Sequence, residues 1–202
     1  GPRPKSSHLL IGRTIGNCIA VYCFYMAVKH TTVAEANILN MTYPVFVALL
    51  TWILFRAQHD PLALGMVGVA FVGIWLILSP AQIDIKLENL WGLASGLFAS
   101  IAILYLNISR RVHDTNTVLF FMFGLGAVVM FLLFHHQFFV PNATELYFLI
   151  LCAVWGVAGQ FLITLGFRFI TAVEGSIISS MRIFIAAILG PLVIGEAPLD
   201  TA

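Results

Sequence analysis

Long apolar runs separated by short polar connections dominate this sequence of 202 residues. Each run is long enough to cross the hydrocarbon core of a bilayer, which takes about 20 residues of helix. A strand of a membrane barrel would instead alternate apolar and polar residues over about ten positions. The pattern therefore predicts an all-α integral membrane protein with about seven transmembrane helices, at 9–28, 32–55, 61–79, 89–109, 116–134, 144–167 and 172–194.

A set of polar residues occurs twice, and the second copy follows the first after 139 residues. Each copy opens one of the predicted helices and continues along it at positions i, i+3 and i+6, which share one helix face. This repetition indicates an internal duplication. Its members are Lys29, Thr32, Glu35, Asn37, Asn40 and Tyr43 in the first copy and Arg168, Thr171, Glu174, Ser176, Ser179 and Arg182 in the second.

The distribution of Lys and Arg predicts the orientation of the helices, because cytoplasmic connections carry an excess of both. Lys29 and Lys86 fall on one side of the predicted bundle. The other side, which we assign to the cytoplasm, holds Arg3, Lys5, Arg13, Arg56, Arg110, Arg111 and Arg168. The two repeated helices are the second and the seventh, so the second copy is inverted relative to the first. Many secondary transporters are built from inverted repeats of this kind.

Composition supports the membrane assignment, since 60% of the residues are hydrophobic, 9% are charged and the mean hydropathy is +0.99. A net charge of +1 with scattered basic residues predicts no nucleic-acid partner. Cys18, Cys23 and Cys152 lack the spacing of a metal site or disulfide framework. His135 and His136 are adjacent, and adjacent side chains do not face each other on a helix. We therefore predict no metal and no other cofactor.

The polar stripes of the two repeated helices predict a cavity between them. Polar side chains of this size either line a cavity or join helices by hydrogen bonds, and the stripe alone leaves both roles open. The first candidates are Asn37, Asn40, Tyr43, Ser176 and Ser179. Weaker candidates on the preceding helix of each copy are Asn17, Tyr25, Trp155 and Gln160.

Arg182 is the most unusual member of the stripe. It lies ten residues after Ala172, roughly 15 Å along the predicted helix and so near the middle of the bilayer. A charge at that depth is costly and indicates a functional site, with an anionic substrate as its counter-charge. The alternative is a structural pair with a carboxylate or with helix-end carbonyl groups.

Two Thr–Glu pairs, Thr32 with Glu35 and Thr171 with Glu174, open the repeated helices. Their spacing is typical of a capping box, in which each side chain binds a free backbone amide of the first turn. We favour this structural role, and gating or coupling at the ends of a transport path is the alternative. Pro44 and Pro191 are expected to bend the two helices locally, because each removes one backbone hydrogen bond.

Four short motifs carry a resemblance to a known family. They are Ala34-Glu35-Ala36 and Val173-Glu174-Gly175 at the starts of the repeated helices, Gly195-Glu196 at the end of the second copy, and Gly92 to Gly96 followed by Arg110-Arg111. With these motifs the chain resembles the EamA family of the drug/metabolite transporter superfamily over essentially its whole length. The first copy departs from the pattern, with Arg56-Ala57 where the second has Gly195-Glu196.

The resemblance implies a bundle of two inverted five-helix repeats, ten helices in all, of which this chain resembles helices three to nine. It implies that residues 1–79 are the C-terminal part of the first repeat. Residues 80–202 would then form the second repeat without its last helix. We expect a truncated sequence for this reason.

The function that the resemblance implies is secondary transport by alternating access. The substrate would be a small polar metabolite such as an amino acid or a derivative, exported across the inner membrane of a bacterium. The partners would be this substrate and the lipid bilayer, and a homodimer is left open. A membrane-embedded enzyme is the first alternative, but the sequence contains no catalytic motif that supports one. A seven-helix receptor is the second, and it would not require an inverted duplication.

Overall fold

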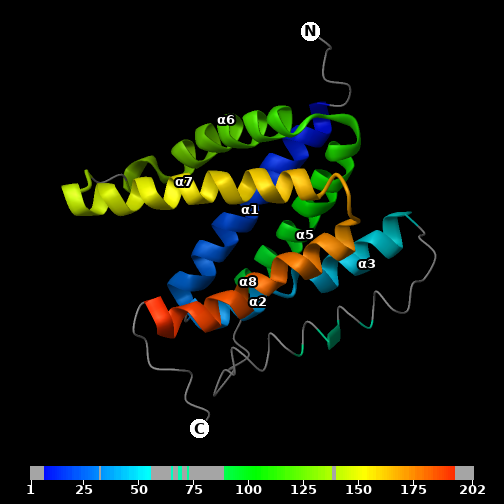
Figure 1. The fold of residues 1–202 in the computed structure, drawn as a ribbon, viewed down its shortest axis with the longest axis horizontal. Coiled ribbons are helices and arrows are strands. Elements are labelled where there is room, and N and C mark those ends of the chain that lie inside the picture. The colour runs from blue at the N-terminus through cyan, green and yellow to red at the C-terminus, as the bar shows by residue number, and fades with distance from the viewer. Residues whose placement is uncertain are drawn as a thin grey trace.

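The computed structural model describes residues 7–31, 33–55, 89–137 and 140–193, together with the single residues 65, 68, 69 and 72. All elements in this part of the chain are helices (Figure 1). In chain order they are α1 (Ser7–His30), α2 (Val33–Asn40), α3 (Tyr43–Phe55), α5 (Asn89–Val112), α6 (Thr115–Phe134), the 3₁₀ helix η1 (His135–Gln137), α7 (Ala143–Gly166) and α8 (Ala172–Val193).

The observed helices confirm the all-α membrane fold that the apolar runs predict. Six of the predicted spans coincide with described helices to within three residues at either end. Among the described residues, five stretches have the length and composition of a membrane span: Ser7–His30, Ala36–Leu54, Asn89–Val112, Thr115–Phe134 and Ala143–Gly166. The predicted span 61–79 lies outside the described residues apart from the four single positions.

One predicted helix differs from the observed structure, because the span 32–55 is divided into α2 and α3 by a turn at Met41 and Thr42. Pro44 has no backbone N–H to donate to the carbonyl of Asn40 four residues earlier. The backbone amide and the hydroxyl of Thr42 both donate instead to the carbonyl of Leu39, at 3.2 and 2.6 Å. The bend expected at this proline is therefore a complete helix break, whereas α8 continues through Pro191.

Helix α5 is the centre of the bundle and contacts α1, α2, α3, α6, α7 and α8. Small residues allow the closest approaches. A Cβ atom added at Gly16 of α1 would lie 3.4 Å from the Cβ of Ala102, and one added at Gly92 would lie 2.6 Å from the Cβ of Leu39. One buried cluster, around Leu106 and Phe167, joins α5 to α1, α6 and the end of α7. The glycine faces along α1 and α5 therefore set how tightly the helices pack.

The two repeated helices pack against each other in antiparallel directions. The hydroxyl of Tyr43, at the start of α3, donates to the carbonyl of Ser176 at 3.0 Å and lies 3.3 Å from the hydroxyl of Ser180. Tyr43 and Val47 belong to one buried cluster with Ala172, the first residue of α8, and Figure 1 shows α3 running toward the end of the molecule where α8 begins. Position along α3 thus increases as position along α8 decreases.

The remaining pair of long helices, α6 and α7, lies on the other side of the bundle. Figure 1 shows α6 and α7 side by side, with α1 and α5 running between this pair and the group of α2, α3 and α8. Helix α7 exposes large apolar side chains along much of its length, including Phe148, Ile150, Val154 and Trp155. This surface is suited to hydrocarbon and not to water, as expected of an integral membrane protein.

Candidate functional site

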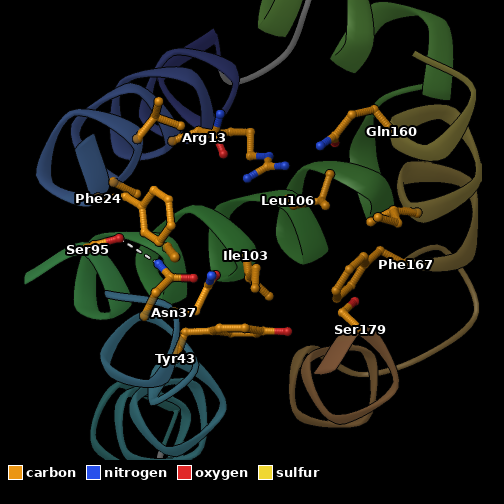
Figure 2. Close-up of a pocket in the computed structure, with 16 residues that line it drawn as sticks. Arg13, Phe24, Asn37, Tyr43, Ser95, Ile103, Leu106, Gln160, Phe167 and Ser179 are labelled. Carbon is orange, nitrogen blue, oxygen red and sulfur yellow. Dashed lines mark hydrogen bonds between the residues drawn. The ribbon is translucent and has the colours of Figure 1, made fainter. Parts of the chain in front are cut away.

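A cavity of about 460 Å³ opens between the central helix and the helices around it. Side chains of α1, α2, α3, α5, α7 and α8 contribute to its wall, and Figure 2 shows them converging on one space from several sides. The lining residues are Arg13, Asn17, Ala20, Val21, Phe24, Asn37, Asn40, Tyr43, Ser95, Ala99, Ile103, Leu106, Gln160, Ile163, Phe167 and Ser179. The wall therefore combines amides and hydroxyls with apolar surface, as small-molecule sites commonly do.

Most of the candidates taken from the sequence lie at this cavity. Six of them line it, and they come from both repeated helices and from the helix that precedes each copy: Asn17, Asn37, Asn40, Tyr43, Gln160 and Ser179. In the first copy, the break between α2 and α3 lies directly between the cavity residues Asn40 and Tyr43. Gly96 of α5 makes room for the break, because a Cβ there would lie 3.1 Å from the carbonyl oxygens of Leu39 and Asn40.

Three candidates lie elsewhere. Ser176 is fully buried against α3, and its hydroxyl donates to the carbonyl of Val173 at 2.7 Å. Trp155 is 70% exposed on the outer face of α7. Tyr25 is 40% exposed and packs edge-on against Phe134 with 5.4 Å between ring centroids. The helix period explains why Ser176 does not line the cavity. Side chains three residues apart on a helix point in directions that differ by about 60°, so Ser179 faces the cavity while Ser176 faces α3.

Two of the cavity residues also join helices, so the two roles considered for the stripe coexist. The Asn40 side-chain amide donates to the hydroxyl of Ser95 on α5 at 2.5 Å, drawn as the dashed line in Figure 2. Tyr43 joins α3 to α8 through the carbonyl of Ser176. These bonds hold the two halves of the broken helix against their neighbours.

The Thr171–Glu174 pair has the geometry of a capping box. The Glu174 carboxylate accepts from the backbone amide of Thr171 at 2.8 Å, and the Thr171 hydroxyl accepts from the backbone amide of Glu174 at 3.3 Å. Both side chains are exposed at the start of α8, away from the cavity lining. Thr32 and the side chain of Glu35 lie outside the described residues, as does the side chain of Arg182.

Arg13 is a charged residue of the cavity wall that was not among the binding candidates predicted from the sequence. Its proximity to the start of the first helix places it among the positive charges of the cytoplasmic side. In the structure its side chain is 5% exposed and lines the cavity, about two turns into α1. The signal available in the sequence is an arginine between apolar residues, Ile11 and Ile15, within a predicted span.

Arg110, another of the predicted cytoplasmic charges, is also buried but has a structural role. Its Nε donates to the carbonyl of Thr164 at 2.9 Å, and its Nη1 donates to the carbonyl of His113 at 2.5 Å. It therefore ties the end of α5 to the end of α7 through carbonyl groups that helix ends leave free.

The cavity is equipped to bind a polar molecule by hydrogen bonds and charge. Within the described ranges, no group of three or more His, Cys, Asp or Glu side chains gathers as metal ligands would. The groups that the described residues offer are amides from three helices, hydroxyls from α3, α5 and α8, and one guanidinium. Such groups can bind a polar molecule through reversible hydrogen bonds.

Comparison with known proteins finds matches among membrane transporters. The profile of the EamA-like transporter family matches residues 3–79 and 86–199. An uncharacterised transporter of Helicobacter pylori is 26% identical to 93% of the chain. The pseudopaline exporter CntI of Pseudomonas aeruginosa is 26% identical to 79% of it, and human solute carrier family 35 member G1 is 21% identical to 98%.

The chain spans 57–65% of the length of these relatives. A solved crystal structure has the same fold, with a TM-score of 0.78 and 18% sequence identity. The match covers 100% of this chain and 73% of the solved one. This similarity supports the observed arrangement of the helices.

Proposed function

Because the chain belongs to the EamA-like transporter family, we propose that it is part of a secondary transporter that moves small polar solutes through the cavity between its helices. The observation that carries the proposal is the cavity itself. Amides and hydroxyls of the repeated helices meet there, inside a bundle whose outer surface is apolar. A solute can exchange water for these groups while it crosses the bilayer.

The mechanism that we propose is alternating access between two inverted repeats, residues 1–79 and 80–202. The antiparallel packing of α3 against α8 supports this arrangement, since the two repeated helices would lie on either side of a pseudo-two-fold axis. The break at Met41–Thr42 supports it as well, because transporter sites are commonly formed at discontinuous helices. Rocking of one repeat against the other would expose the cavity to each side in turn.

The substrate class that we propose is amino acids or their derivatives, and the direction is export across a bacterial inner membrane. The name of the Pseudomonas relative, a pseudopaline exporter, supports export as the direction of transport. Membership of the family supports transport over the alternatives of an enzyme or a receptor. Arg182, which occupies the same helix as the cavity residue Ser179, remains proposed as a further binding residue.

The proposed function is tested by filling the cavity. We expect Ser179→Trp to abolish flux of labelled amino acids in proteoliposomes that contain the full-length protein, because an indole would occupy the space that the solute needs. The matched control is Ile178→Trp, since Ile178 is the preceding residue and is 57% exposed on the outer face of α8. This control should transport at close to the wild-type rate.

Fluorescence-detected gel filtration shows whether both variants are folded before their flux is compared. Wild-type flux in a folded Ser179→Trp protein would mean that the solute does not pass through this cavity. Equal loss of flux in both variants would assign the effect to the packing of α8 and would also contradict the proposal.

A further inference from the structure

We propose that Arg13 is the anchor for the anionic group of the substrate, and that this group is a carboxylate. The inference rests on the proposed transport function and specifies its substrate class. It assigns a binding role to a residue near the cytoplasmic end of α1, on a helix outside the repeated pair.

The Arg13 guanidinium is buried without a partner that matches its charge. The side chain is 5% exposed, and its Nε has no hydrogen-bond partner. Its one hydrogen bond within the described structure joins Nη2 to the sulfur of Met122, at 3.9 Å. A thioether is a weak acceptor and carries no charge, so it does not replace the hydration that the guanidinium loses on burial.

Arg110 shows how this protein satisfies a buried arginine that serves structure alone. Two backbone carbonyls accept from its guanidinium. It lies at the end of α5, where unpaired carbonyls are available. Arg13 lies inside α1, where the carbonyls are already bonded within the helix, and it projects into a cavity instead. An unpaired cation at the wall of a membrane cavity is expected to meet an anion that arrives with the solute.

The surroundings of Arg13 form one end of the cavity. Figure 2 shows its guanidinium directed into the space between α1 and α7, with Gln160 on the opposite wall. The Oε1 atom of Gln160 is also buried without a hydrogen-bond partner. This end of the cavity thus offers a charged donor and a neutral acceptor, both unpaired, while Asn37 and Ser179 lie at the other end.

The number of charged groups in the cavity wall indicates which kind of anion fits the cavity. Among the described residues that line the cavity, Arg13 is the one charged residue, and none is an Asp or a Glu. A single guanidinium matches a monoanion, and its planar fork matches the two oxygens of a carboxylate. A phosphate monoester carries nearly two charges at neutral pH and would call for a second cation. Gln160 can accept from an amino or amide N–H group of the same molecule.

The test compares four forms of each ligand, which separate the carboxylate from the amine. The ligands are leucine, glutamine and histidine, each as the free amino acid, the primary amide, the N-acetyl amino acid and the N-acetyl amide. Dissociation constants are measured by thermal-shift titration of the purified full-length protein in detergent. Uptake of the same compounds is measured in proteoliposomes. The variants are Arg13→Gln and Arg13→Lys, with Arg111→Gln as the matched loss of an exposed arginine.

The expected result is a preference for carboxylates that depends on Arg13. Wild-type protein and Arg111→Gln should bind both carboxylate forms about 10- to 100-fold more tightly than the matching amides, as charge-assisted hydrogen bonds allow. Arg13→Gln should reduce this ratio to less than about threefold without weakening the amides. Arg13→Lys should keep part of the preference, because an ammonium retains the charge and loses the fork.

Three results would overturn the inference. The first is an unchanged carboxylate preference in Arg13→Gln. The second is loss of the preference in Arg182→Gln, measured as a further variant, with Arg13→Gln unaffected. The third is tighter binding of glycerol 3-phosphate, titrated as a further ligand, than of every carboxylate. If Arg13→Gln does not fold, the test rests on Arg13→Lys. Equal weakening of carboxylate and amide binding in Arg13→Lys would also overturn the inference.

The outcomes also separate the inference from the proposed transport function. Arg13-dependent binding without flux would contradict the transport function but not the inference. Flux without an Arg13-dependent preference would contradict the inference alone.

Discussion

Two asparagines of α2, Asn37 and Asn40, have different roles at the cavity, one in binding and one in structure. Asn40 donates to Ser95, whose side chain is completely buried. Asn37, one turn earlier, lines the same cavity, and its side chain makes no hydrogen bond to another described residue. A solute can therefore use the Asn37 amide without breaking a contact of the fold.

Alanine substitutions should separate these two roles. We expect Asn40→Ala to lower the free energy of unfolding by about 0.5–1.5 kcal/mol, the range measured for hydrogen bonds between membrane helices. Asn37→Ala should leave unfolding nearly unchanged and weaken substrate binding by about 3- to 10-fold. Thermal unfolding in detergent and ligand titration measure the two quantities. Equal effects of both substitutions on unfolding would contradict the division.

Single residues also show where prediction from sequence succeeds and where it stops. The spacing of Asn37, Asn40 and Tyr43 is sufficient to place them on one face, because the helix period fixes their directions. The same argument fails for Ser176, since the face that it shares with Ser179 is wide enough to meet both α3 and the cavity. Arg13 is missed because orientation rules treat an arginine near a helix end as a loop charge, and only the packed bundle shows that it is buried.

At the scale of the elements, the break between α2 and α3 depends on the glycine face of α5. A Cβ at Gly96 would lie 2.8 Å from the Thr42 hydroxyl and 3.1 Å from two backbone carbonyl oxygens. Backbone oxygens cannot rotate away as a side chain can. The broken helix must therefore move as a whole to admit any larger residue.

We expect Gly96→Ala to destabilise the protein by about 1–3 kcal/mol, as overpacking of a tight contact does. The matched control is Gly124→Ala on α6, where no atom lies within 4 Å of the added Cβ. Because alanine is favoured over glycine inside a helix, Gly124→Ala should be neutral or slightly stabilising. Chemical or thermal denaturation in detergent compares the two. Similar stability of both variants would show that α2 and α3 do not depend on this contact.

The elements were the most predictable level of the structure, and the break shows the limit. Continuous apolar runs fix the length of a membrane helix, so α1, α5, α6, α7 and α8 begin and end close to their predicted positions. A proline in such a run predicts a bend, but a bend, a kink and a full break look alike in sequence. Whether Pro44 ends a helix is decided by Thr42 and by the glycine that faces it.

For the molecule as a whole, the duplicated polar stripe predicts a pair of related helices around a shared cavity. The structure packs α3 against α8. That the two helices are related by an inverted duplication stays a prediction. The division into repeats 1–79 and 80–202 stays a prediction. So does alternating access, because the substrate path is a property of two conformations and one arrangement of helices represents a single state.

Accessibility of the cavity from the two sides of the membrane tests the account most directly. Ser179→Cys is introduced into the full-length protein after every native cysteine, including Cys18, Cys23 and Cys152, has been replaced by serine or alanine. A membrane-impermeant maleimide is applied to either face of oriented vesicles. We predict that Ser179→Cys is labelled from both faces, while Ile178→Cys, on the apolar outer face of α8, is labelled from neither. Labelling of Ser179→Cys from one face only, or from neither, would contradict alternating access through this cavity.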